Sequence, residues 1–116
     1  MSPVIFIFFL HFVGDFVFQT SQMALNKSKS IKWLTLHILT YTAVIFVGVL
    51  LIFDLQLAIY FTLVNAGLHW VTDFFTSKLN ARLNQMENKR WFFTGIGFDQ
   101  FIHATCLLAT YEHFSS

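Results

Sequence analysis

The sequence predicts an all-α protein that spans a membrane as a four-helix bundle. Of its 116 residues, 56% are hydrophobic and only 11% are charged, and the mean hydropathy is +0.63. A soluble core of this length would hide only part of so much apolar surface, whereas lipid accepts that surface as the protein exterior. Four segments are apolar over about the length that crosses a bilayer, so we expect a single transmembrane domain over residues 1–116.

The first expected helix covers about residues 3–20 and is apolar apart from His11, Asp15 and Gln19. Pro3 suits a helix start, because the amide hydrogen that it lacks would have no partner in the first turn. The segment has no basic start and no small-residue cleavage site, so we expect it to be a helix of the protein and not a signal peptide. The polar residues 21–30 are expected to form a loop or a short interfacial turn.

The second expected helix, residues 31–53, is the cleanest spanning segment, since Val44–Ile52 contains no ionisable group. Asp54 and Gln56 indicate a tight turn into a third helix over residues 57–80. The polar stretch 81–90 then leads to a fourth helix over residues 91–113. Such short connections make sequential helices antiparallel neighbours.

Positive charge lies beside two of the expected connections and is absent from the turn at Asp54. The cations concerned are Lys27, Lys29 and Lys32 at the first connection and Lys78, Arg82, Lys89 and Arg90 at the second. Because cytoplasmic loops are enriched in Lys and Arg, both connections are expected in the cytoplasm and both termini on the outer side.

Two classes of function and cofactor are disfavoured by composition. The formal net charge is +1 and there is no run of like charges, so nucleic acid is not an expected partner. Cys106 is the only cysteine, so the chain has no internal disulfide and no thiolate metal motif.

Each expected helix carries a polar line at a spacing of about four residues, which places its members on one face. The lines are His11, Asp15 and Gln19 in the first helix, His37 and Tyr41 in the second, Asn65, His69, Asp73 and Ser77 in the third, and Asp99 and His103 in the fourth. A weak repeat relates residues 11–16 to residues 69–74, which favours placing the two motifs at one depth.

The depths of these side chains agree across the four helices. At ~1.5 Å per residue, three aspartates and His37 lie roughly 7–11 Å from the cytoplasmic ends, and the other three histidines lie roughly 13–17 Å deep. We therefore expect one buried cluster of seven candidate metal ligands: His11, Asp15, His37, His69, Asp73, Asp99 and His103.

The chemistry of this set points to a divalent metal. An aspartate at membrane depth costs roughly 2.5–3.5 kcal/mol, so several together need neutralisation. Imidazole and carboxylate are ligands of zinc, iron and manganese; we expect zinc first, as one or two ions. Asp15, Asp73 and Asp99 are the candidate catalytic residues. The side chains expected to support the ligands are Gln19, Asn65, Gln100 and Tyr41. The alternative is that His and Asp pair by hydrogen bonds that set helix register without metal.

The run His11-x-x-x-Asp15-Phe16-x-x-Gln19-Thr20, continuing through Met23-Ala24 to Asn26-Lys27, resembles the signature of a family of small bacterial membrane proteins with no assigned function. His37, His69-x-x-x-Asp73 and Asp99-Gln100-x-x-His103 fall where later polar positions of that family are expected. More loosely, the chain is similar to the membrane-bound metal-dependent hydrolases of bacteria. The resemblance implies a location in the bacterial inner (cytoplasmic) membrane and, by analogy alone, hydrolase activity.

The expected function is an intramembrane metal-dependent hydrolase acting near the cytoplasmic leaflet on a lipid or another amphipathic molecule, with membrane lipids as its partners. A metal or proton transport or sensing module is the competing expectation, and as a pore it would require a homo-oligomer. A non-catalytic structural membrane subunit is the third. The apolar run Val44–Phe53 has no polar line, which favours a hydrolase or sensor over a conduit.

Overall fold

The computed structural model describes residues 3–115, apart from the side chains of residues 24 and 25, and this part of the chain contains helices and turns but no strand. The predicted all-α fold class is therefore confirmed. In chain order the elements are α1 (Pro3–Phe12), the π-helix η1 (Val13–Val17), α2 (Ser21–Asn26), α3 (Ile31–Val49), α4 (Leu55–Gln85) and α5 (Lys89–Ser115).

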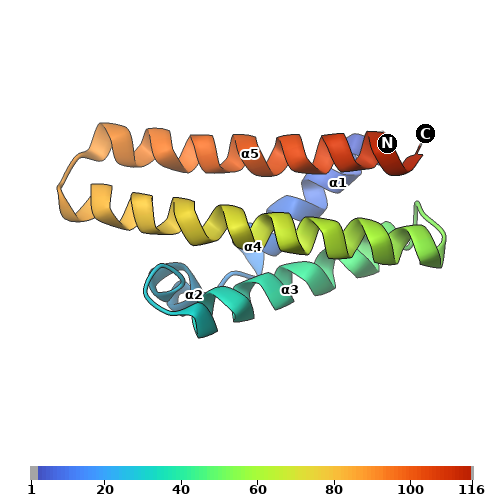
Figure 1. Cartoon of the computed structure of the whole chain (residues 1–116), viewed down its shortest axis with the longest axis horizontal. Coiled ribbons are helices and arrows are strands. Elements are labelled where there is room, and N and C mark those ends of the chain that lie inside the picture. The colour runs from blue at the N-terminus through green and yellow to red at the C-terminus, as the bar shows by residue number, and fades with distance from the viewer. Residues whose placement is uncertain (1–2, 116) are drawn as a thin grey trace.

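Helices α4 and α5 form a long antiparallel hairpin, and α3 crosses beside α4 (Figure 1). Helix α1 contacts both α3 and α5, which closes the bundle. The start of α1, the end of α5 and the α3–α4 turn lie at one end of the molecule, and α2 lies toward the other. The longest dimension is 46 Å, which matches the length of about 46 Å expected for the 31 residues of α4.

Several helix boundaries differ from those predicted. The first helix ends at Val17 and not at residue 20, and the expected polar loop 21–30 contains α2, whose N-cap is Thr20: its hydroxyl oxygen accepts a hydrogen bond from the Met23 amide at 3.2 Å. Helix α3 ends at Val49, short of residue 53. Helices α4 and α5 are longer than the expected ranges 57–80 and 91–113.

Local hydrogen bonds explain the extent of α4. The carboxylate of Asp54 accepts a hydrogen bond from the Leu57 amide at 2.8 Å and so begins the helix at the expected turn. At the other end the helix continues through residues 81–85, because polar residues such as Arg and Gln extend a helix as well as apolar ones do. Glu87 then adopts a positive φ of 57°, which ends the helical path before α5.

The apolar core lies at the end of the bundle that holds the start of α1 and the end of α5. Its buried members are Ile7, Leu10, Tyr41, Ile45, Val49, Ala58, Phe61 and Leu107. Close packing of α1 on α3 depends on Gly48, since a Cβ at this position would collide with the side chain of Leu10. This core closes one end, and the polar side chains occupy the middle of the bundle.

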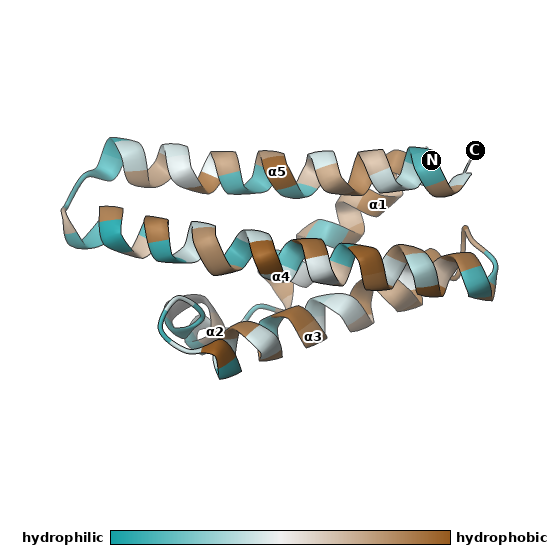
Figure 2. Ribbon diagram, viewed as in Figure 1, coloured by the Kyte–Doolittle hydropathy of each residue, from teal (hydrophilic) through white to brown (hydrophobic). Residues whose placement is uncertain are grey.

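Many more large apolar side chains lie on the surface than is usual for a soluble protein. Large apolar side chains are exposed along every long helix; Val47, Phe75 and Phe101, for example, are 65–67% exposed. The buried polar side chains instead lie in the middle of the bundle. Figure 2 accordingly shows hydrophobic and hydrophilic residues alternating along α4 and α5. An apolar exterior around a polar interior suits a lipid environment.

Among the described residues, one helix, Ile31–Val49, is long and apolar enough by composition to cross a membrane, and Pro3–Val17 forms a shorter apolar helix. The four predicted spans are thus not all recovered by length and hydropathy. The physical reason lies in α4 and α5, where buried residues such as Asn65, Asp73 and Asp99 lower the mean hydropathy although they face away from the exterior.

Candidate metal centre

Three aspartates and four histidines are buried where η1, α1, α3, α4 and α5 approach one another. None of the seven is more than 8% exposed. They are the residues expected from the sequence: His11, Asp15, His37, His69, Asp73, Asp99 and His103. The spacing of four residues explains their common direction, because each pair on one helix occupies the same face one turn apart.

Asp15 reaches the centre from a π-helix and not from a regular α-helix. The Phe18 amide donates to the Val13 carbonyl at 3.0 Å across this widened turn. Gly14 precedes Asp15 and lies directly against Tyr41, where a Cβ would be 2.9 Å from a ring carbon. Single π-turns inside helices occur often at functional sites, since they redirect one side chain.

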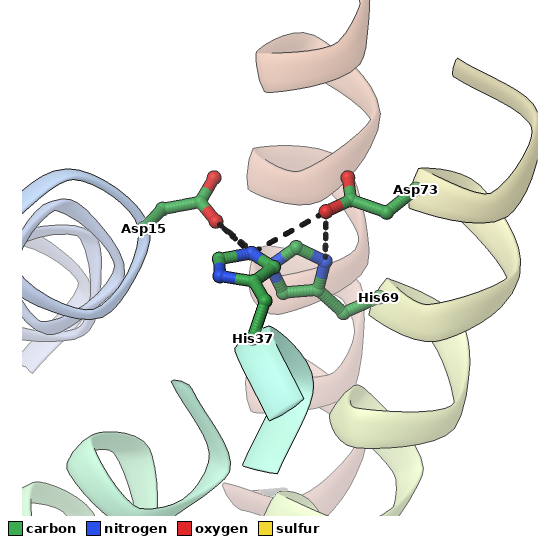
Figure 3. Close-up of side chains that lie close together, drawn as sticks. All are labelled: Asp15, His37, His69 and Asp73. Atoms are coloured by element: carbon green, nitrogen blue, oxygen red, sulfur yellow. Dashed lines mark hydrogen bonds and ion pairs between the residues drawn. The ribbon is translucent and has the colours of Figure 1, made fainter. Parts of the chain in front are cut away.

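Four of the side chains form a first group in which two imidazoles lie between two carboxylates (Figure 3). His37 Nε2 is 2.9 Å from Asp15 Oδ1 and 3.4 Å from Asp73 Oδ2. His69 Nε2 is 3.1 Å from Asp15 Oδ1, and its Nδ1 is 3.6 Å from Asp73 Oδ2. These four residues each offer one ligand atom within 4.8 Å of the others.

A second group consists of Asp15, Asp99 and His103, again with ligand atoms within 4.8 Å of one another. His103 Nε2 lies 3.2 Å from Asp99 Oδ1 and 3.0 Å from Asp73 Oδ1. The Thr76 hydroxyl donates to Asp99 Oδ1 at 2.5 Å and holds that carboxylate in place. Asp15 belongs to both groups, and the two oxygens of Asp73 face imidazoles of different groups. The arrangement therefore has the shared carboxylates that a two-ion site requires.

The donor set fits a divalent ion on three counts. Two ligands bonded to one ion at about 2.0–2.2 Å are about 3.0–3.5 Å apart, and the nitrogen–oxygen separations here are 2.9–3.6 Å. Neither ring nitrogen of His37 has a well-aligned hydrogen-bond partner among the described residues, although the ring is fully buried. Finally, three carboxylates are buried beside one ammonium, that of Lys27, which leaves two negative charges uncompensated if the imidazoles are neutral. A buried cluster of this charge needs protons or a cation.

His11 stands apart from both groups. Its Nδ1 is 2.9 Å from the Tyr41 hydroxyl, and its Nε2 is 2.8 Å from Gln100 Oε1 and 3.7 Å from Asp15 Oδ2. Both ring nitrogens are therefore engaged by other side chains. The structure thus places His11 where it can orient the candidate ligands. In the sequence pattern, by contrast, its position is equivalent to that of His69.

Gln100 connects the parts of the cluster. Its amide nitrogen donates to Asp15 Oδ2 at 3.3 Å and to Asp99 Oδ2 at 3.1 Å, while its oxygen faces His11. Tyr41 contacts the cluster through His11 and through the ring of His69, with ring centroids 4.1 Å apart. Both residues occupy the supporting positions expected from the sequence.

The other two expected supporting residues lie farther from the ligand atoms. The Gln19 amide donates to the backbone carbonyl of Asp15 at 2.9 Å, which ties down the end of η1. Asn65 donates to the Phe61 carbonyl and to the Thr110 hydroxyl, both at 2.9 Å, and so pairs α4 with α5 one turn away from His69. Asn65 thus supports the helix packing around the cluster.

Lys27 was missed as a site residue. Its ammonium donates to Asp73 Oδ2 at 3.2 Å, the same oxygen that faces His37 and His69. The sequence pattern placed Lys27 in a polar connection, and nothing in its spacing relates it to an aspartate 46 positions away. Thr76 was missed for a similar reason, since it lies one position away from the polar line of its helix.

By its fold and its buried residues, the protein is a small all-helical protein with a His–Asp cluster that could hold a metal ion. The chain belongs to the DUF3307 family, described as proteins of unknown function, whose model matches residues 4–116. Membership in an uncharacterised family agrees with the resemblance drawn from the signature around His11 and Asp15. No curated protein and no solved structure matches the chain.

Proposed function

We propose that this protein is an intramembrane metal-dependent hydrolase that acts on a lipid or other amphipathic substrate at the cytoplasmic side of the bacterial inner membrane. The proposal depends on one observation: the carboxylates of Asp15, Asp73 and Asp99 are buried beside three imidazoles. Neither ring nitrogen of one of these, His37, has a well-aligned hydrogen-bond partner among the described residues. Burial of so many ionisable groups is costly, and such groups tend to mark functional sites.

The proposal includes four membrane spans, made by α1 with η1, by α3, by α4 and by α5. Exposed phenylalanines on the outside and buried polar groups inside support lipid as the solvent of the bundle. The contact of Lys78 with the Ser28 carbonyl, 2.9 Å long, brings the two cation-rich connections to one end. Positive charge at that end supports a cytoplasmic orientation for both connections.

The metal would be held by Asp15, His37, His69 and Asp73, with Asp99 and His103 available for a second ion. A bound divalent ion would supply Lewis-acid polarisation of an ester or phosphoryl oxygen and a lowered pKa for water. Asp99 is suited to accept the proton of the attacking water, since it lies at the edge of the cluster and lines an open cavity. Gln100 and Thr76 would keep its oxygens oriented through their hydrogen bonds.

Transport is less well supported than hydrolysis. A conduit would need polar groups from the cluster to the opposite end of the bundle. That end is filled by the apolar core around Ile45, Val49 and Phe61, which are at most 1% exposed. Because this core blocks a path through the bundle, the packing fits sensing or catalysis at one leaflet better than transport.

Metal analysis of the detergent-purified full chain tests the first half of the proposal. We expect one or two equivalents of zinc, iron or manganese in the wild type and a large loss in His69→Gln and Asp73→Asn, which keep side-chain volume. His113→Gln is the matched control, because His113 is exposed near the end of α5. A folded, metal-free wild type that takes up no ion on titration would refute the metal site.

Hydrolysis of phospholipid and isoprenoid-phosphate substrates in mixed micelles, measured with and without chelator, tests the second half. We expect turnover that chelation abolishes and that zinc or manganese restores. Asp99→Asn is expected to reduce turnover while the ion held by Asp15, His37, His69 and Asp73 is retained, because this residue would act on the proton. Metal-loaded protein without turnover of any substrate in the panel would favour a sensing role instead.

A further inference from the structure

A half-open cavity of about 530 Å³ begins at the cluster and extends toward the α4–α5 turn. Asp15 and Asp99 line its inner part, and side chains from Thr76 to Gln85 line it along α4. Thr76 and Gln85 are nine positions apart in the helix, which makes that wall about 14 Å long. The cavity therefore joins the candidate metal centre to the surface at the cation-rich end.

The lining of the cavity includes two lysines. Lys27 and Lys29 both line it, from the segment that follows α2. This segment is tied to α4 at two points, through the contact of Lys27 with Asp73 and the hydrogen bond from Lys78 to the Ser28 carbonyl. The lysines are thus carried by a positioned backbone and not by a free loop. The acidic residues of the lining are Asp15 and Asp99, which already face imidazole or amide groups.

One amide oxygen in the lining, Gln19 Oε1, is buried and has no hydrogen-bond partner in the part of the chain that the structure describes. The orientation of Gln19 is set by the hydrogen bond from its nitrogen to the Asp15 carbonyl, which leaves the oxygen as the free acceptor. Asn80 Oδ1 is also unpartnered among the described residues, but it packs against Gly95, where an added Cβ would collide with it. A buried acceptor without a donor is costly, so the Gln19 oxygen indicates a ligand with a hydroxyl group.

Part of the remaining wall is apolar. Phe16, which is 49% exposed, lines the cavity together with Phe92 and Ile96, and the neighbouring Phe93 is 66% exposed. A cavity lined both by cations and an acceptor and by exposed aromatic rings matches a molecule that is polar at one end and apolar at the other.

We infer that this cavity binds the headgroup of an anionic glycerophospholipid that carries free hydroxyl groups, such as a phosphoglycerol headgroup. The phosphate lies near Lys27 and Lys29, a hydroxyl group of the headgroup donates to Gln19, and the acyl chains leave past Phe16. The inference rests on the proposed function, because it names the class of substrate for the same site. The headgroup enters from the cytoplasmic leaflet, where the cavity reaches the surface.

Lipid binding to the full chain in detergent, measured by native mass spectrometry in the presence of chelator, tests the inference without requiring turnover. The probes are phosphatidylglycerol, phosphatidic acid, phosphatidylcholine and water-soluble glycerol phosphate. We expect phosphatidylglycerol to bind most tightly, phosphatidic acid next, and the other two at least tenfold more weakly. Equal binding of phosphatidylglycerol and phosphatidylcholine would overturn the headgroup assignment, and soluble glycerol phosphate binding as tightly as the lipid would overturn the lipid.

Two variants locate the binding. Lys29→Gln should weaken phosphatidylglycerol binding about fivefold, since one cation near an anionic lipid is worth about 1 kcal/mol. Lys32→Gln is the matched control, because Lys32 is exposed nearby but does not line the cavity. Gln19→Ala should reduce the preference for phosphatidylglycerol over phosphatidic acid. Equal effects of the Lys29 and Lys32 variants would overturn the site.

The two proposals fail in different ways. Selective phosphatidylglycerol binding by protein that takes up no metal would retain the headgroup site and refute the hydrolase. Metal-dependent turnover without any headgroup preference would retain the hydrolase and refute the headgroup site.

Discussion

Replacing Gly14 by alanine tests how the π-helix positions Asp15. The added Cβ would be 2.9 Å from Tyr41 Cδ2 and 3.4 Å from Tyr41 Cα. The first separation is roughly 0.6 Å shorter than the closest favourable carbon contact. Tyr41 cannot move away easily, because it is buried, its hydroxyl contacts His11 at 2.9 Å and its ring packs on His69. We therefore expect η1 to shift, at a cost of about 1–3 kcal/mol in the free energy of unfolding.

The assay is unfolding of the purified protein in mild detergent by added denaturing detergent, followed by far-UV circular dichroism. Gly67→Ala is the matched control: Gly67 is also helical, but a Cβ there meets nothing within 4 Å. The control should be more stable than wild type by about 0.5–1 kcal/mol, since alanine favours the helix. Gly14→Ala that is as stable as Gly67→Ala would refute the reasoning. Because Asp15 adjoins Gly14, we also expect zinc affinity to fall about tenfold or more in Gly14→Ala.

Three further predictions concern other parts of the molecule. Glu87→Gly should raise the free energy of unfolding by about 1 kcal/mol, because glycine adopts a φ of 57° without strain; an unchanged denaturation midpoint would contradict this. Asp54→Ala should lower it by about 0.5–2 kcal/mol through loss of the cap on the Leu57 amide, and Asp54→Asn should retain most of the stability in the same assay. Chelation should lower the thermal midpoint of the wild type but not of Asp15→Asn, since an ion at a hundred times its Kd adds about 2.7 kcal/mol; equal shifts would exclude a site that depends on Asp15.

The helical fold class and the members of the cluster were predictable because they depend on local periodicity. Residues four apart in a helix share one face, so the pairs His69 and Asp73 or Asp99 and His103 had to point the same way once helices formed. The structure adds that the helices pack with those faces inward. Whether the cluster holds metal stays a prediction.

The helix ends and the number of recognisable spans were less predictable. Hydropathy marks where an apolar stretch stops, but helices continue wherever backbone hydrogen bonds are satisfied, which is why α4 runs to Gln85 and not to residue 80. The short helix α2 was missed because it contains polar residues and depends on the cap that Thr20 provides. Inward-facing polar groups also lower the hydropathy of α4 and α5, so composition alone marks α3 as a span.

The sequence by itself determined that the protein is helical, largely apolar outside, and polar along one face of each long helix, because these properties follow from composition and from spacing within single helices. Only the tertiary structure decided the partners of each group: that Asp15 faces His37 and His69, that His11 turns to Tyr41 and Gln100, and that Lys27 reaches Asp73. Such pairings join residues 22 to 89 positions apart. They depend on how whole helices cross, and no local pattern along the chain specifies a crossing.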